Sequence, residues 1–203
     1  MTALTSLFVN AAVEGIVDEA VLRRIFVDTN ASLNRIYIAE GKSRLLHRLA
    51  SYNHAANWQP WIVLIDLDQD ASCAPIARQN WLPEQAPNLC FRIAVRAVES
   101  WLLADTVALA EYLHVPRSQV PQQPDILNDP KLTMVNLAQQ SRRSAIVRDM
   151  IPRPGSGRSI GPAYSARMIE FAYSHWRPRV AKDNSDSLQK LFHCIEMLLA
   201  TEG

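Results

Sequence analysis

The stretch that decides the fold is Trp61-Ile62-Val63-Leu64-Ile65, which runs directly into Asp66-Leu67-Asp68-Gln69-Asp70. A short apolar run rich in branched residues is typical of a strand buried on both faces of a parallel sheet. Its carboxylates follow at the carboxyl end of the strand, where open α/β sheets bind ligands. Since side-chain direction repeats every second residue in extended backbone, we expect Asp66, Asp68 and Asp70 to converge.

Three unpaired carboxylates held so close together would repel one another. A hard divalent cation that takes oxygen ligands would relieve this repulsion. The sequence therefore predicts that Asp66, Asp68 and Asp70 bind Mg²⁺, or Mn²⁺ in its place. The alternative is that these aspartates only end a strand and begin a turn.

The rest of the N-terminal half alternates between strand-like and helix-like patterns. Strands are expected at 7–13, 35–39, 61–65 and 89–95, and helices at 17–26, 43–56 and 97–113. Such alternation predicts an α/β fold with a parallel sheet flanked by helices.

Four prolines then follow in quick succession, at positions 116, 121, 124 and 130, and mark the best boundary in the chain. We expect a core over residues 1–115 and a mainly helical, basic extension over residues 116–203 that packs on it. The extension should contain helices at 131–140, 164–176 and 186–200.

The composition is that of an ordinary globular protein, with 203 residues, of which 48% are hydrophobic and 20% charged. No run approaches the roughly 18 apolar residues that a membrane span needs, and no signal peptide is evident, so we expect a cytoplasmic protein without membrane contact. Cys73, Cys90 and Cys194 are odd in number and far apart, which indicates reduced packing residues.

The net charge of +1 conceals an asymmetry along the chain. Residues 141–182 hold nine Lys and Arg against two acids, a local balance of +7, so the remainder carries −6. A basic half beside an acidic half suits a polyanionic substrate, with Arg142, Arg143 and Arg158 among the expected contacts. Alternatively, the basic surface pairs with the acidic half of the same protein.

Two acidic strand ends point to a known family. Glu14-Gly15 closes the first expected strand, with Asp18 close behind, and Asp66-Leu67-Asp68 closes a later one. This pairing resembles the TOPRIM domain of topoisomerases, primases and OLD-type nucleases. The glycine that often follows the aspartates in topoisomerases and primases is absent here, where Gln69-Asp70-Ala71 stands.

A third motif extends the resemblance. The stretch Arg96-Ala97-Val98-Glu99-Ser100-Trp101-Leu102-Leu103 looks like the third acidic motif of a compact TOPRIM-like group, largely of unknown function. Members of that group are often encoded beside ATPases in bacterial anti-phage loci. The resemblance covers roughly residues 5–105 and, more weakly, 129–131 and 161–164.

The resemblance implies a Rossmann-like TOPRIM-type sheet and a Mg²⁺-dependent nuclease that cleaves DNA or RNA. Glu14 would act as general acid or base, Glu99 would join the aspartates at the metal, and Lys131 would steady a phosphate as a point charge. Arg96 and Tyr164 would contact the substrate. A role as the effector of an anti-phage defence system, with an ATPase partner, would follow. A homodimer is a separate expectation, because two-fold homodimers are the commonest oligomers.

Each of these residues also has a structural explanation. Glu14 could cap a helix N-terminus, and Glu99 could pair with Arg96 or Arg92. Lys131 could be a solvated lysine, and Tyr164 a packed or base-stacking side chain. The Gly41-Lys42-Ser43 segment is no phosphate-binding P-loop, because Ile36 stands where that motif needs its first glycine.

Two other functions compete with the nuclease. An Asp-x-Asp after a buried strand also occurs in haloacid-dehalogenase-type phosphatases and in nucleotide-sugar transferases. The phosphatase pattern usually has Thr or Val where this chain has Asp70. The chain could also be a non-catalytic assembly module with a TOPRIM-like shape.

Overall fold

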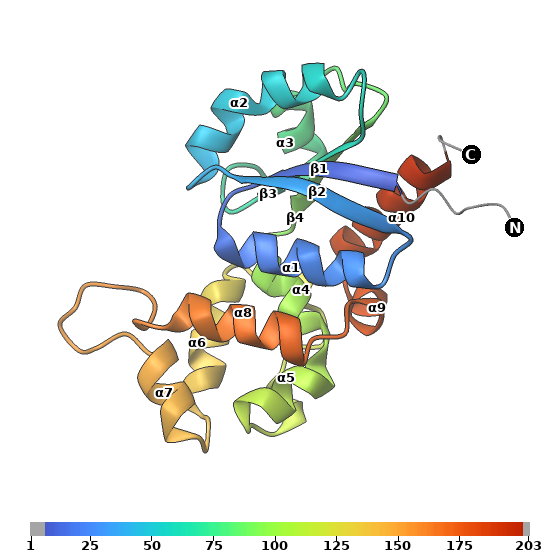
Figure 1. The fold of residues 1–203 in the computed structure, drawn as a ribbon. Coiled ribbons are helices and arrows are strands. Elements are labelled where there is room, and N and C mark those ends of the chain that lie inside the picture. Colours follow the sequence, from blue (N-terminus) through green and yellow to red (C-terminus); the bar gives the residue numbers. More distant parts are fainter. Residues whose placement is uncertain (1–6, 201–203) are drawn as a thin grey trace, which may run out of the picture.

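A four-stranded, all-parallel sheet lies at the centre of the computed structural model, which describes residues 7–200 (Figure 1). The strands are β1 (Leu7–Val13), β2 (Ala31–Ile38), β3 (Trp61–Asp66) and β4 (Leu89–Ala94), in the order β2-β1-β3-β4. The predicted α/β class is confirmed.

The decisive strand β3 lies between β1 and β4, and every one of its six residues is buried. Strand β2 begins at Ala31, earlier than expected, and pairs in parallel register from Leu7↔Ala31 onward. Much of β2 is only partly buried, which is why its first half lacks the apolar pattern that would have revealed it.

Helices cover both faces of the sheet (Figure 1). One face packs against α2 (Lys42–Ala55) and α3 (Ala74–Trp81), and the other against α1 (Ile16–Val27), α4 (Val98–Ala104) and α10 (Asp186–Ala200). Each face of the sheet has its own hydrophobic core, and alternate residues of β3 belong to different cores. Ile62 and Leu64 pack in the larger core, whereas Val63 and Ile65 pack in the smaller one.

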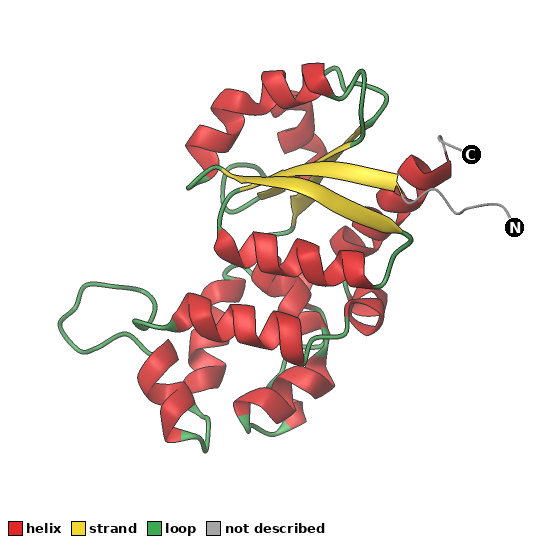
Figure 2. Cartoon of the chain, viewed as in Figure 1, coloured by secondary structure: helices red, strands yellow, loops and turns green. Residues whose placement is uncertain are grey.

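The helical C-terminal region extends from the α1 side of the sheet (Figure 2). It comprises α6 (Pro130–Gln139), α7 (Ser144–Met150), α8 (Tyr164–Ser174), α9 (Pro178–Ala181) and α10, with short 3₁₀ turns at Arg117–Gln119, Pro124–Ile126 and Lys182–Asn184. It shares the larger core with the sheet, since α8 packs on α1 and α10 packs on β4. The division of the chain at residue 115 stays a prediction.

Two expectations about the helices were wrong. The single helix expected over 97–113 is two helices, α4 and α5 (Thr106–Leu113), separated at Asp105. Asp105 is fully buried and accepts a hydrogen bond from the Ala108 N–H, so it caps α5 rather than continuing α4. Helices α3, α7 and α9 were not expected at all.

The expectation of three reduced cysteines was also wrong. Cys90 on β4 and Cys194 on α10 form a disulfide across 104 residues of sequence, while Cys73 is free. The pairing was invisible in the sequence because only the packing of α10 against β4 brings these two positions together. Within residues 7–200, no helix has the length and apolar character to cross a membrane.

Candidate functional site

The carboxyl ends of β1 and β3 bring Glu14 and Asp66 into direct contact. The backbone N–H of Asp66 donates to Glu14 Oε1 over 2.7 Å, although the two residues are 52 positions apart. Neighbouring parallel strands end at the same edge of the sheet, so the first acidic motif meets the second. The contact expected between these motifs is therefore present.

Asp18 joins them from the first turn of α1. Its Oδ2 accepts a hydrogen bond from the Gly15 N–H at 3.1 Å, so its carboxylate closes the start of the helix. Only 6% of Asp18 is exposed, and its Oδ1 is buried without a hydrogen-bond partner in the part of the chain that the structure describes.

Glu99 reaches the same place from the first turn of α4. The N–H of Val98 donates to Asp66 Oδ1 over 3.0 Å, which holds the start of α4 against the end of β3. Glu99 is 2% exposed. Its Oε1 accepts from the Tyr164 hydroxyl at 3.3 Å and lies 3.6 Å from Lys131 Nζ. Its Oε2 is buried with no partner among the described residues.

These side chains line one cavity of about 330 Å³, here called the acidic cavity. It is bounded by Glu14, Asp18, Glu40, Asp66, Glu99, Lys131, Ile160 and Tyr164, among others. Glu40 is exposed and pairs with Arg44, which leaves four carboxylates facing a single lysine in this part of the described chain. Such an excess of negative charge is costly away from water unless protons or a cation compensate it.

The electrostatic cost appears in the pKa values of the buried acids. Burial, reinforced by Glu14 and Glu99, raises the pKa of Asp18 to about 7. Burial and the charge of Asp18 raise the pKa of Asp66 well above its ordinary value. Burial also raises the pKa of Glu14, although the hydrogen bond from the Asp66 N–H and the charge of Lys42 oppose the shift.

The pKa values of Lys131 and Tyr164 are raised as well. The nearby Glu99 raises the pKa of Lys131, so this lysine stays positively charged. Burial, with the adjacent Glu99, raises the pKa of Tyr164 well above its ordinary value, so its hydroxyl keeps its proton and donates to Glu99. These contacts replace the pairing of Glu99 with Arg96 or Arg92 that we considered from the sequence.

The aspartate ladder does not converge as expected. Strand β3 ends at Asp66, and Asp68 adopts a left-handed conformation with φ of 48°, so the backbone turns there instead of continuing the alternation. Lys42 Nζ pairs with Asp68 Oδ2 at 2.6 Å and with Asp70 Oδ2 at 2.7 Å. Burial lowers the pKa of Lys42, but its hydrogen bonds to these two aspartates outweigh burial and leave the pKa raised.

Asp68 nevertheless remains close to the site. It lines a smaller cavity of about 220 Å³ that shares Lys131 with the acidic cavity and also includes Arg96 and Asp129. The guanidinium of Arg96 donates to the backbone oxygens of Asp68 at 2.7 Å and Ala71 at 3.2 Å. Arg96 thus supports the aspartate turn, a role that the sequence did not suggest.

The remaining predicted substrate contacts lie outside the acidic cavity. Arg142 and Arg143 are exposed before α7, and Arg158 is exposed on the loop between α7 and α8, whose Ile160 lines the cavity. Other basic residues of the C-terminal region form ion pairs within the protein. Arg167 pairs with Asp149, and Arg177 pairs with Asp105.

Two residues of this site were not among the predicted ligands or catalytic groups. Asp18 follows Glu14 by four positions, and its place in the first turn of a helix was the available signal. Lys42 was set aside with the incomplete P-loop motif, and nothing in the sequence pairs it with Asp68 and Asp70.

The carboxylate oxygens of this cavity are the kind of ligand that a hard divalent cation prefers. Within residues 7–200, no three side chains among His, Cys, Asp and Glu form a ready-made set of metal ligands. Mg²⁺, however, is commonly held by one or two carboxylates and keeps several waters. The two buried oxygens without partners, Asp18 Oδ1 and Glu99 Oε2, are acceptors of the kind that such an ion or its waters would satisfy.

Comparisons of the chain with protein-family models, with curated proteins and with solved structures find no match. The TOPRIM resemblance therefore stays a prediction that rests on the sequence motifs.

Proposed function

We propose that this chain is a Mg²⁺-dependent phosphodiesterase that hydrolyses nucleic acid. The observation that carries the proposal is the meeting of Glu14, Asp18, Asp66 and Glu99 at one cavity, where two of their buried oxygens have no partner among the described residues. Carboxylates gathered at the strand ends of a parallel sheet suit a cation that handles phosphate oxygens.

Asp18, Asp66 and Glu99 are the residues that would hold the cation, which Mn²⁺ could replace. When bound, a divalent cation offsets charge on the transferring phosphoryl group and lowers the pKa of water. Asp68 and Asp70, tied to Lys42, add negative charge beside the cavity. Their proposed part is thus less direct than the sequence suggested.

Glu14 is the proposed general base, and it returns the proton as general acid. Its raised pKa brings it toward the neutral range in which proton transfer at a carboxylate is most effective. Lys131 is placed to steady a phosphate oxygen, because it stays charged and lines both the acidic cavity and its smaller neighbour. Tyr164 holds Glu99 in position through its hydroxyl.

The substrate would approach across the exposed arginines of the C-terminal region. Arg142, Arg143 and Arg158 keep their charge on the surface, and the loop that carries Arg158 ends at the cavity wall. Such arginines hold a phosphate backbone without reading its sequence. Action in the cytoplasm as an anti-phage effector, an ATPase partner and a homodimeric state belong to the same proposal.

The test is cleavage of labelled DNA and RNA by the purified chain with Mg²⁺ or Mn²⁺. We expect Asp66→Asn and Glu14→Gln to lower the rate at least about 100-fold, the range in which removal of a general base falls. Asp183→Asn is the matched control, because Asp183 is exposed on the 3₁₀ turn before α10 and lies outside the acidic cavity.

Calorimetric titration with Mn²⁺ separates metal binding from activity. Asp66→Asn should weaken Mn²⁺ binding, whereas Asp183→Asn should leave it unchanged. A wild-type chain that binds no divalent cation and cuts neither nucleic acid, even with its neighbouring ATPase supplied, would contradict the proposal.

A further inference from the structure

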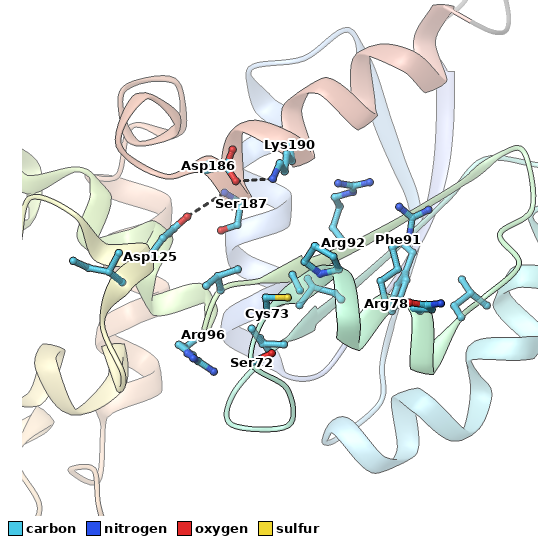
Figure 3. Close-up of a pocket in the computed structure, with 18 of the residues that line it drawn as sticks. Ser72, Cys73, Arg78, Phe91, Arg92, Arg96, Asp125, Asp186, Ser187 and Lys190 are labelled. Atoms are coloured by element: carbon cyan, nitrogen blue, oxygen red, sulfur yellow. Dashed lines mark hydrogen bonds and ion pairs between the residues drawn. The ribbon is translucent and has the colours of Figure 1, made fainter.

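A second cavity, larger than the first, lies beside β4. Its volume is about 670 Å³, and its walls come from α3, β4, the 3₁₀ turn at Pro124–Ile126 and the first turns of α10. Figure 3 shows Asp186, Ser187 and Lys190 of α10 on one wall, opposite Ser72 and Cys73. No residue in the described range 7–200 lines both this cavity and the acidic cavity, so the two are separate sites.

The charge of this second cavity is opposite to that of the first, and we call it the basic cavity. It is lined by Arg78, Arg92, Arg96 and Lys190 against only two acids, Asp125 and Asp186. Both acids already have partners: Asp186 pairs with Lys190 at 2.6 Å, and Asp125 accepts from Ser185 and Ser187. Since the donors to Asp125 are uncharged, three arginines remain against one carboxylate, and the cavity keeps a net positive charge.

Arg92 is the residue of the basic cavity that an anionic ligand would stabilise most directly. Its Nε is buried and finds no hydrogen-bond partner in residues 7–200. Burial lowers the pKa of Arg92, and the charge of Arg78 lowers it further. An anion between these two guanidinium groups would satisfy the buried donor and remove their mutual repulsion.

Part of the remaining wall is apolar. Leu82, Pro75 and Val95 line the cavity, and Ile126 on its rim is 74% exposed. A cavity of this size accommodates a small organic molecule, and cations beside an apolar part of the wall fix the orientation of such a ligand. An inorganic anion would use the arginines and leave the apolar surface uncovered.

We propose that the basic cavity binds a small organic phosphate of the nucleoside phosphate class. Arg92 and Arg78 hold the phosphate, and the body of the ligand covers Leu82 and Ile126. The guanidinium fork matches phosphate oxygens in two parallel hydrogen bonds, which a lysine could not provide. This site is independent of the nuclease proposal, because it needs neither the metal nor the acidic residues.

The test is calorimetric titration of the full chain with AMP and ATP, beside adenosine and inorganic phosphate. EDTA is present throughout, so that no metal draws the nucleotide into the acidic cavity. We expect AMP or ATP to bind at least about tenfold more tightly than adenosine or phosphate, a difference of about 1.4 kcal/mol.

Arg92→Gln and Arg78→Gln should each weaken nucleotide binding at least about tenfold. Arg48→Gln, which removes an exposed charge from α2, should leave it unchanged. Circular dichroism checks that each variant folds, and Arg78 serves as the second probe because it is exposed on α3 and tolerates substitution.

Three outcomes would overturn the proposal. The first is the absence of saturable binding of either nucleotide by the wild-type chain. The second is inorganic phosphate binding as tightly as AMP, since the apolar wall would then have no part. The third is an equal loss of oligonucleotide and nucleotide binding in Arg92→Gln, since the cavity would then belong to the path of a nucleic acid.

Discussion

The ionisation of Asp18 is the most direct measure of the electrostatic cost of the acidic cavity. Its pKa of about 7 lies far above the ordinary 3.8, because burial and the neighbouring Glu14 and Glu99 disfavour its ionised form. A carboxyl group with a raised pKa in the folded chain stabilises the fold most at low pH. That contribution is lost as the pH rises from about 4 to about 7.

Asp18→Asn should therefore flatten the fall in stability across this range. The amide oxygen can still accept the hydrogen bond from Gly15, while the charge is gone. Without divalent cations, we expect the variant to be more stable than the wild type at pH 8 by a few kcal/mol, and similar to it at pH 4. Urea unfolding at both pH values measures this.

Added Mg²⁺ supplies the control for that experiment. If the ion neutralises the buried acids, it should stabilise the wild type at pH 8 more than the Asn variant. A variant that is less stable than the wild type at pH 8 would show that the charge of Asp18 is not a cost to the fold.

The break between α4 and α5 depends on one buried aspartate. Asp105 caps α5 and also accepts from the backbone N–H, Nε and Nη2 of Arg177, at 3.0, 2.9 and 2.7 Å. A single carboxylate thereby ends one helix, begins the next and ties the start of α9 to both.

Asp105→Ala should cost about 2–4 kcal/mol in the free energy of unfolding, since it removes a helix cap and charged hydrogen bonds together. Asp105→Asn keeps an acceptor for the cap and should cost less. Urea denaturation gives both values, with Asp183→Ala as an exposed control expected within about 0.5 kcal/mol of wild type. An Ala variant as stable as that control would contradict this account.

The sequence predicted the elements whose pattern is local and missed those set by distant contacts. The buried run of β3 and the strand β1 were evident, since their apolar residues are consecutive. The helix break at Asp105 was not evident, because its main partner, Arg177, lies 72 positions away.

The candidate site could likewise be predicted only in part from the sequence. The meeting of Glu14 and Asp66 was expected because both residues follow strands of a parallel sheet, as in the TOPRIM domains that the motifs resemble. The turn at Asp68 did not follow, because it depends on Lys42 and on Arg96, which holds the backbone of the turn. The positive charge of residues 141–182 also could not reveal which arginines form ion pairs within the protein.

At the scale of the whole molecule, a loop with exposed arginines reaches the acidic cavity. Arg153 and Arg158 are exposed on the loop between α7 and α8, which projects away from the helices in Figure 1 and returns to the cavity at Ile160. A long phosphate backbone could contact the loop while one of its phosphates occupies the site.

Arg153→Gln and Arg158→Gln should weaken nucleic-acid binding and reduce its salt dependence. For each phosphate that the variant no longer neutralises, the slope of log affinity against log salt should fall by about 0.7–0.9, with little effect of sequence. Fluorescence anisotropy at several salt concentrations measures the slope. Arg48→Gln, on the other face of the sheet, is the control, and a slope unchanged in both loop variants would exclude the loop from binding.

Arg96 lines both the basic cavity and the smaller cavity of about 220 Å³ that includes Asp68, and its guanidinium holds the turn that carries Asp68. Any molecule that prefers one position of this side chain must shift the equilibrium at the other cavity. Thermodynamic reciprocity requires that the effect be equal in both directions. If the proposed nucleotide weakened binding of the proposed cation, the cation would weaken binding of the nucleotide by the same factor, so the two ligands would report on each other through one arginine.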